Sequence, residues 1–245
     1  MYFETAAYTD CGAREKNEDA WHCAVTNGQL LALVADGLGG MGHGELASGD
    51  AIAFLPGYLD GEGVDEDRLC DAIQAENARI RQMQVGGLTM MTTIAALWAD
   101  SRMAIAATVG DTRIYQFRNG HILYQSVDHS VAQMAVFSGE ITAGQIRQFP
   151  GRNRLLRALG VDDTTQVDLQ DLDSLPGDRF LLCSDGFWEL ITEEEMQKMC
   201  LPADTAAQWL ERMRSAVSRR SGPRGDNHTA ITVILREGNR NDEEH

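Results

Sequence analysis

Four aspartates stand where an apolar run meets a glycine, and carboxylates in such positions can bind a cation. They are Asp36 in "LVADG", Asp111 in "ATVGD", Asp185 in "LLCSDG" and Asp226 in "GDNHTAITVIL". Each apolar run is typical of a buried strand, which holds its end rigidly. If the four ends converge, the like charges cannot all stay ionised unless a cation neutralises them. Hard divalent cations prefer oxygen ligands, so the pattern predicts a divalent metal site.

Two further segments supply groups for such a site. The segment "REKNEDA" places Glu18 and Asp19 shortly after Arg14, which adds two carboxylates and one guanidinium fork. In "LVADGLGGMGHGE", glycine takes five of the eight positions after Asp36, which indicates a backbone that turns sharply or approaches something closely. A single Asp-Gly pair is more simply a turn, and only the coincidence of four favours a shared site.

The composition limits the possible partners and compartments. The chain of 245 residues has a formal net charge of −16, which argues against binding to nucleic acid or to an anionic membrane surface. Its five cysteines are scattered and never form a CxxC pair, which argues against a zinc-thiolate site and a disulfide framework. No apolar stretch approaches the length of a membrane span, and the first residues lack a secretory pattern, so we expect a cytoplasmic protein.

Short apolar runs and helical patterns predict the elements of the fold. The expected strands are 29–35, 92–99, 103–109, 113–117, 179–183 and 229–235, and the expected long helices are 45–59, 65–83 and 205–217. Several strands follow one another directly, with Asn119-Gly120 as a hairpin turn, so the sheet should be largely antiparallel with helices outside. Ser130, Thr142 and Thr192 each match a reciprocal capping pattern and predict the starts of shorter helices.

Eight sequence blocks occur in an order and spacing that match one known family. They are "REKNEDA", "VADGLGG" followed by "GELAS", "TTIAAL", "ATVGDTRIY", "DHS", "NRLLRALG", "LLCSDGFWE" and "GDNHTAITVIL". In these blocks the chain resembles the metal-dependent Ser/Thr protein phosphatases of the 2C type, particularly compact bacterial members. The resemblance implies an α+β fold: a four-layer α-β-β-α sandwich with two central, mainly antiparallel sheets, flanking helices and a helical flap near the active site. It also implies one catalytic domain at 1–237, followed by a polar tail at 238–245.

The resemblance assigns metal-binding roles to the acidic residues. It implies that Asp36 bridges two core ions, Mg²⁺ or Mn²⁺, and that Asp185 and Asp226 complete one of the two sites. Glu18 and the backbone carbonyl of Gly37 help to form the other. In this family, a water held between the two ions loses a proton near neutral pH and attacks the phosphorus, while the ions offset charge on the phosphoryl oxygens.

Other positions match the family's remaining site residues. Arg14 resembles the arginine that grips the substrate phosphate, for which a planar fork is suited. Asp19 resembles a carboxylate that orients metal-bound waters without ligating a metal. Asp111 and Asp185, with Glu189 as a further candidate ligand, resemble a third, weaker metal site, although many relatives carry aspartate at position 189.

Two regions leave alternatives open. Some relatives carry a candidate general acid, a histidine, where this chain has Leu38, so a metal-bound water or His43 would have to protonate the leaving group. For His43 we favour an exposed loop position over a catalytic role. Residues 128–160 resemble the flap, and its arginines either steer a phosphoprotein, contact the acidic edge of the domain or form internal salt bridges: Arg152, Arg154 and Arg157.

We therefore expect an enzyme, a Mg/Mn-dependent protein serine/threonine phosphatase that opposes a bacterial Ser/Thr kinase. The expected partner is a phosphorylated signalling protein, and the expected state is a monomer. Two alternatives share the fold: a silent phosphoprotein-binding regulator and a hydrolase for small phosphate esters. A cysteine phosphatase is excluded because the stretch after His22 and Cys23 lacks the required arginine, and a P-loop NTPase because the chain has no Gly-Lys pair.

Overall fold

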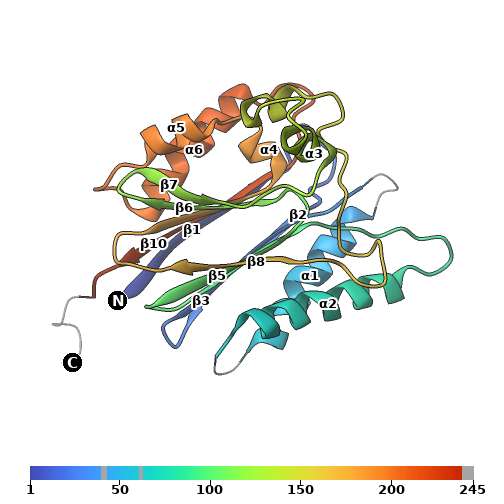
Figure 1. Cartoon of the computed structure of the whole chain (residues 1–245), viewed down its shortest axis with the longest axis horizontal. Coiled ribbons are helices and arrows are strands. Elements are labelled where there is room, and N and C mark those ends of the chain that lie inside the picture. The colour runs from blue at the N-terminus through green and yellow to red at the C-terminus, as the bar shows by residue number, and fades with distance from the viewer. Residues whose placement is uncertain (40–42, 61–62, 239–245) are drawn as a thin grey trace.

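Two antiparallel sheets lie face to face, with helices on both outer sides (Figure 1). The structure is a computed structural model that describes residues 1–39, 43–60 and 63–238. One sheet has the order β1 (Tyr2–Asp10), β10 (His228–Arg236), β9 (Arg179–Cys183), β6 (Arg113–Arg118) and β7 (His121–Gln125). The other has the order β2 (Asp19–Thr26), β3 (Gln29–Asp36), β4 (Ile94–Ala99), β5 (Met103–Val109) and β8 (Asp168–Asp173). The predicted four-layer α+β sandwich is confirmed.

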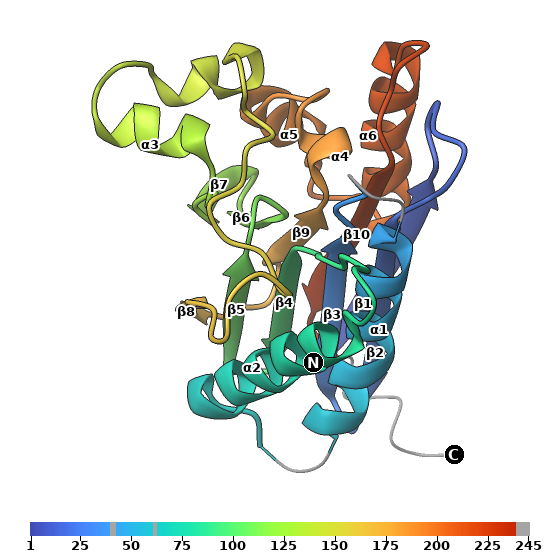
Figure 2. The ribbon, with the colours of Figure 1, turned by 90° about the vertical axis from the view of Figure 1, so that its right-hand side faces the viewer.

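Helices cover the outer face of each sheet (Figure 2). Helices α1 (Gly44–Leu59) and α2 (Glu66–Met83) lie against the sheet that contains β2. Helices α4 (Asp185–Trp188), α5 (Glu193–Met199) and α6 (Ala206–Arg220) lie on the side of the β1 sheet. The segment predicted as the flap, 128–160, carries the short helix α3 (Val131–Phe137) and the 3₁₀ helix η1 (Ala143–Gln148).

The central strands are apolar throughout because each has a packed layer on both faces. In β3, Leu33 and Ala35 belong to the apolar cluster that includes residues of α1 and α2. Ala32 and Val34, which point the other way, belong to the cluster between the two sheets. Burial on both faces explains why the sequence shows continuous apolar runs here in place of strict alternation.

All six predicted strands are present, but the predicted ranges did not include β1, β2, β7 and β8, of which β7 was implied only by the hairpin turn. These four carry exposed or partly exposed side chains along most of their length and so lack a continuous apolar run. Strand β4 begins at Ile94, two residues later than predicted, because Thr92 forms isolated bridges with Gly37 and Leu159 instead. The predicted hairpin turn is confirmed, with φ of 53° at Asn119 and 80° at Gly120.

The predicted helix starts are present, with two differences in detail. Thr192 and Glu195 form the reciprocal capping box of α5, and Thr142 precedes η1, which is a 3₁₀ helix. At α3 the Ser130 hydroxyl accepts a hydrogen bond from the Gln133 backbone at 3.2 Å, and the described residues show no reciprocal bond. Within the described ranges, no helix has the length and apolar character needed to cross a bilayer. Apart from Gly238, the predicted tail lies outside the described residues.

Glu76 in α2 is a buried carboxyl group whose ionisation opposes folding. Its side chain is fully buried, and neither oxygen accepts a hydrogen bond within the described part of the chain. Burial, and then the nearby Asp50, raises its pKa from 4.5 to about 8. Because the folded-state pKa lies above the unfolded value, the free energy of unfolding falls as the pH rises from about 4.5 to about 8.

We predict that Glu76→Gln raises the free energy of unfolding at pH 8 by about 1–3 kcal/mol and makes its fall between pH 5 and pH 8 smaller by a similar amount. Urea denaturation at the two pH values measures both effects. Glu66→Gln, an exposed carboxyl change on the same helix, serves as the control and should leave the pH dependence as it is. A Glu76→Gln profile that follows the wild-type profile would contradict the assignment.

Candidate active site

The predicted site residues meet in a cleft of about 370 Å³ where β3 and β9 end, β10 begins and β5 turns into β6. Those that line it are Arg14, Glu18, Asp36, Gly37, Asp111, Asp185 and Asp226. Asp19 lies behind this lining, only 8% exposed, and is paired with Asp36 in the register of β2 and β3. The structure therefore brings together the four strand-end aspartates that the sequence places far apart.

The backbone of Asp36 is held by the two threonines of "TTIAAL". Its N–H donates to Thr93 Oγ1 at 3.0 Å, and its carbonyl oxygen accepts from the Thr93 N–H at 2.9 Å. The Thr92 hydroxyl donates to the same carbonyl oxygen at 2.9 Å. These bonds fix the end of β3 and leave the carboxylate of Asp36 facing the cleft.

Charge repulsion is severe among the clustered carboxyl groups. Burial raises the pKa of Asp36 well above its usual value, and Asp19, Asp185, Asp111 and Asp226 raise it further. Burial also raises the pKa of Asp185, to which Asp111 adds, and it raises the pKa of Asp111 to about 7. A bound cation would reverse these shifts, because it favours the charged form of each carboxyl group.

Asp19, behind the cleft lining, has one buried carboxylate oxygen without a hydrogen-bond partner among the described residues. Its Oδ2 accepts a hydrogen bond from the Ser184 hydroxyl at 2.6 Å, and Ser184 in turn accepts from the Thr229 N–H at 3.0 Å. Its Oδ1 has no partner within the described residues, and burial raises the pKa of Asp19 to about 6. Ser184, which the sequence analysis missed, thus fixes one carboxylate oxygen of Asp19.

The donor set fits a hydrated divalent cation, although not a tightly ligated one. Among the described residues, no three His, Cys, Asp or Glu side chains already form a ligand group for a metal ion. Instead, Arg14 Nη2 donates to Asp226 Oδ2 at 2.8 Å. An ion such as Mg²⁺ keeps several of its waters and uses one or two carboxylates, so a wide ring of oxygen donors is compatible with it. The repelling carboxyl groups and the unpaired oxygen of Asp19 favour such an ion.

Close backbone packing accounts for two of the glycines that follow Asp36, and a third lies against the Glu18 side chain. A side-chain carbon on Gly37 would overlap the Gly44 carbonyl, and one on Gly44 would overlap Gly37. A side-chain carbon on Gly39 would overlap the carboxylate of Glu18. The main chain here approaches Glu18 and the start of α1 more closely than any other residue type allows. Gly40 and Gly42 lie outside the described residues.

Asn227 is a second site residue that the sequence analysis missed. Its Nδ2 donates to the backbone oxygens of Cys11 and Lys16, both at 2.9 Å, and its Oδ1 accepts from the Glu18 N–H at 2.8 Å. These three bonds hold the loop that carries Arg14 against the start of β10. The only signal in the sequence is the position of this asparagine directly after the last aspartate of the pattern.

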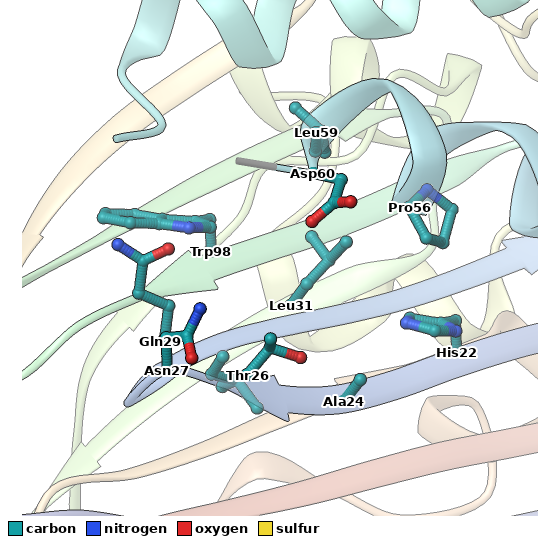
Figure 3. Close-up of a pocket in the computed structure, with 11 residues that line it drawn as sticks. His22, Ala24, Thr26, Asn27, Gln29, Leu31, Pro56, Leu59, Asp60 and Trp98 are labelled. Carbon is teal, nitrogen blue, oxygen red and sulfur yellow. The ribbon is translucent and has the colours of Figure 1, made fainter. Parts of the chain in front are cut away.

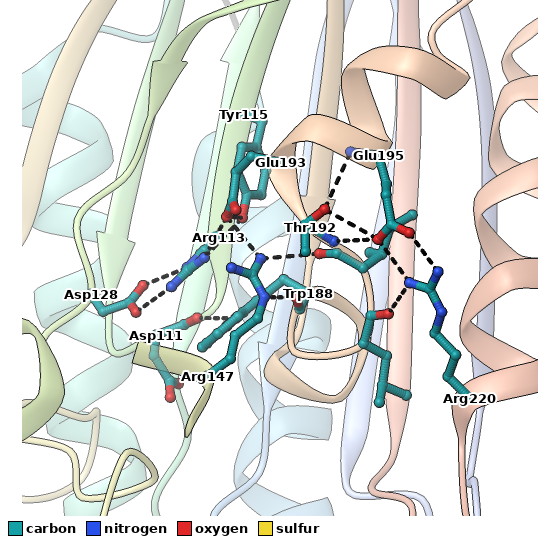
Figure 4. Close-up of polar contacts among 12 residues, drawn as sticks. Asp111, Arg113, Tyr115, Asp128, Arg147, Trp188, Thr192, Glu193, Glu195 and Arg220 are labelled. Atoms are coloured by element: carbon teal, nitrogen blue, oxygen red, sulfur yellow. Dashed lines mark hydrogen bonds and ion pairs between the residues drawn. The ribbon is translucent and has the colours of Figure 1, made fainter. Parts of the chain in front are cut away.

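A buried network ties Asp111 to the predicted flap segment (Figure 4). The Trp188 indole N–H donates to the Asp111 carbonyl at 2.9 Å, and the Arg113 guanidinium lies 3.5 Å from the centroid of the same ring. Arg113 also donates two hydrogen bonds to Asp128, at 2.8 and 2.7 Å, while Arg147 of η1 donates to the Trp188 carbonyl at 3.0 Å. Residues that precede and follow the predicted flap segment in the chain thus help to fix the backbone at Asp111.

Salt bridges occupy two of the three arginines in "GRNRLLRALG". Arg152 donates to both oxygens of Glu189 at 2.5 and 2.9 Å, and Arg157 donates to Asp168 at 2.9 Å. This supports the salt-bridge interpretation for these two, whereas Arg154 forms no salt bridge within the described residues. Arg152 therefore competes with a third metal ion for the carboxylate of Glu189.

The position where some relatives carry a histidine, Leu38, and the candidate proton donor His43 lie in different places. Leu38 lines the cleft and offers no proton. His43 directly precedes α1 and so lies in the loop, as predicted, but it is half-buried, so the expected exposure is wrong. It is not among the described residues that line the cleft.

A larger cavity of about 500 Å³ lies away from these residues, between the β2–β3 hairpin and the end of α1 (Figure 3). Its lining includes Leu31, Pro56 and Trp98 on the apolar side and His22 and Asp60 on the polar side. Since Asp60 is the one carboxylate among its described lining residues, this cavity lacks the carboxylate cluster of the cleft. The metal chemistry belongs to the cleft.

The fold and the cleft define a class of protein: a two-sheet sandwich with an oxygen-donor metal site and an arginine suited to phosphate. The family model of protein phosphatase 2C matches residues 12–221. The chain therefore belongs to the protein phosphatase 2C family, and the family predicted from the eight sequence blocks is confirmed. Its enzyme class is that of the metal-dependent serine/threonine phosphatases.

Similar proteins agree with this assignment. The serine/threonine phosphatase stp of Listeria monocytogenes serotype 4b is 31% identical over 222 residues, which cover 85% of each chain. The crystal structure of the Mycobacterium tuberculosis serine/threonine phosphatase PstP/Ppp superposes with a TM-score of 0.86 at 29% identity and covers 97% of this chain and 100% of that chain. A structure of the PstP catalytic domain with two manganese ions has a TM-score of 0.82 at 29% identity and covers 96% and 99%.

We predict that Mn²⁺ raises the melting temperature of the protein by about 5–10 °C when its concentration is roughly a hundred times its Kd. Asp36→Asn should remove most of this shift. Without metal, the same variant should melt higher than the wild type, because it relieves repulsion among buried carboxyl groups. Thermal denaturation with and without Mn²⁺ measures both effects.

Glu194→Gln is the matched control, because Glu194 is an exposed acid of α5 paired with Lys198 on the helix surface. It should keep the full Mn²⁺ shift. A wild-type melting temperature that does not respond to Mn²⁺ or Mg²⁺ at millimolar concentration would rule out the metal site.

Proposed function

We propose that this protein hydrolyses phosphoserine and phosphothreonine in protein substrates, with two divalent ions, Mg²⁺ or Mn²⁺, bound in the cleft. The observation that carries the proposal is the convergence of Asp36, Asp185 and Asp226 with Arg14 at the end of both sheets. Membership of a phosphatase family and the likeness to a manganese-bound structure support it.

In this proposal Arg14 binds the substrate phosphate. Its side chain is 56% exposed and lies on the rim of the cleft. The hydrogen bond to Asp226 raises the pKa of the guanidinium, so the charge is permanent. Phosphate oxygens and Asp226 compete for the same donors, and a planar fork can hold two phosphate oxygens at once.

The carboxylates hold the ions and the water. Asp36, Asp185 and Asp226, with Glu18 and the Gly37 carbonyl, would bind the two core ions, and Asp111 a third, weaker one. Ions bound there would supply a hydroxide nucleophile near neutral pH and offset the charge on the phosphoryl oxygens. Asp19 keeps its free oxygen available to accept a hydrogen bond from a water in the cleft and so orients that water.

The wider context is also part of the proposal. We infer a cytoplasmic, monomeric phosphatase that opposes a bacterial Ser/Thr kinase and acts on a phosphorylated signalling protein. The five unpaired cysteines suit a reducing compartment, and the charge of −16 disfavours nucleic acid and anionic membranes as partners. A silent binding protein is the weaker alternative, because every carboxylate of the site is present.

We predict Mn²⁺-dependent release of phosphate from a phosphothreonine peptide, abolished by a chelator and reduced at least 1,000-fold in Asp36→Asn, since several kcal/mol of electrostatic stabilisation are lost. Phosphate release measured at equal concentrations of the peptide and p-nitrophenyl phosphate separates the alternatives. No turnover of either would support the binding protein, and a higher kcat/KM for the small ester would support the ester hydrolase.

We also predict that Arg14→Lys lowers kcat/KM for the peptide about 10-fold or more, because an ammonium group cannot hold two phosphate oxygens in the same fork. The loss should appear mainly in KM if the arginine binds phosphate equally in the ground and transition states. Lys16→Arg, in the same loop, is the control and should keep wild-type kinetics. Equal activity of Arg14→Lys and wild type would remove Arg14 from the site.

A further inference from the structure

A second, basic pocket adjoins the cleft. It has a volume of about 390 Å³ and shares Arg14, Asn153 and Asp226 with the cleft lining. From this shared rim it extends to Arg152 and Arg224. A polypeptide whose phosphorylated residue lies in the cleft can therefore place a neighbouring side chain in this pocket.

The charge of the pocket is opposite to that of the protein as a whole. Its lining holds three arginines against two carboxylates, Glu189 and Asp226, which leaves a net charge of +1. Arg14 and Arg152 already neutralise these two carboxylates. Arg224 is exposed and forms no salt bridge within the described residues, so it supplies the uncompensated charge.

The backbone holds Arg224 in a fixed position relative to Arg14. Gly222 to Gly225 form a turn in which the Gly225 N–H donates to the Gly222 carbonyl at 2.9 Å, and Pro223 presets the backbone at its second position. The Gly225 carbonyl accepts from the Ala13 N–H at 3.0 Å. The turn with Arg224 is thereby fastened to the loop that carries the phosphate-binding arginine.

We propose that this pocket binds an anionic side chain of the substrate, a carboxylate or a second phosphate, close in sequence to the phosphorylated residue, and that Arg224 determines this specificity. The inference rests on the proposed phosphatase function and names its substrate class. A surface with a net charge of −16 repels an acidic phosphoprotein over most of its area. The guanidinium groups beside the cleft offer such a substrate a local attraction with bidentate geometry.

The test compares phosphothreonine peptides in an alanine background, each with one glutamate at one of the three positions before or after the phosphothreonine. For each enzyme the measured quantity is the ratio of kcat/KM for the glutamate peptide to that for the all-alanine peptide. In the wild type the ratio should reach about 3–10 at one or two positions, as expected for a partly exposed ion pair. A second arm places phosphoserine at the preferred position and shows whether a phosphate exceeds a carboxylate.

Arg224→Ala should bring the preferred ratio close to one, and Arg224→Glu should bring it below one. Arg102→Ala is the matched control, because Arg102 is also exposed, changes the net charge equally and lies in the β4–β5 turn, away from the strand ends that form the cleft. It should keep the wild-type ratio.

Two results overturn the inference. One is hydrolysis of all peptides without an acidic preference, and the other is an equal change of the ratio in Arg224→Ala and Arg102→Ala. Both leave the proposed phosphatase function intact. If the wild type hydrolyses none of the phosphopeptides in the presence of Mn²⁺, the proposed function itself fails, and this inference fails with it.

Discussion

Mutual repulsion of buried carboxyl groups is the constraint on which the rest of the structure depends. Asp19, Asp36, Asp111 and Asp185 all have raised pKa values, with burial as the largest cause and neighbouring carboxyl groups raising them further. Without a cation, burial of these carboxyl groups makes the free energy of folding less favourable, and the packing of the two sheets must offset this loss. A divalent ion changes that cost into attraction, so the arrangement that opposes folding is also the one that binds metal.

Hydrogen bonds hold the main chain in place at the positions that carry the repelling carboxyl groups. Thr92 and Thr93 hold the end of β3, Asn227 holds the N-terminal loop, and Trp188 holds the backbone at Asp111. The carboxylates therefore stay close together despite their repulsion, because the backbone at the strand ends cannot move apart. Because these anchors come from separate strands and helices, the geometry of the site depends on the correct assembly of both sheets.

The rim of the cleft has a different character. Arg14, Arg152 and Arg224 bring positive charge to one margin of an acidic molecule. Two of them are held by carboxylates, and the third lies on a turn hydrogen-bonded to the Arg14 loop. The acidic interior suits cations, and the basic margin suits the anionic groups of a phosphorylated chain. Their proximity in one small region links metal binding to substrate choice.

The apolar runs and the residues at their ends determined the six buried strands, the long helices and the four aspartates, because side-chain burial and strand ends leave local patterns in a sequence. Strands β1 and β2 left no such pattern. β1 is held by pairing with β10, at the other end of the chain, and β2 by pairing with β3, the next strand. Only the tertiary structure decided that Ser184 and Asn227 support the site, that Arg152 neutralises Glu189, and that Arg224 lies beside Arg14. These contacts join residues distant in the chain, and no local pattern specifies which polar groups long-range packing will bring within hydrogen-bond distance.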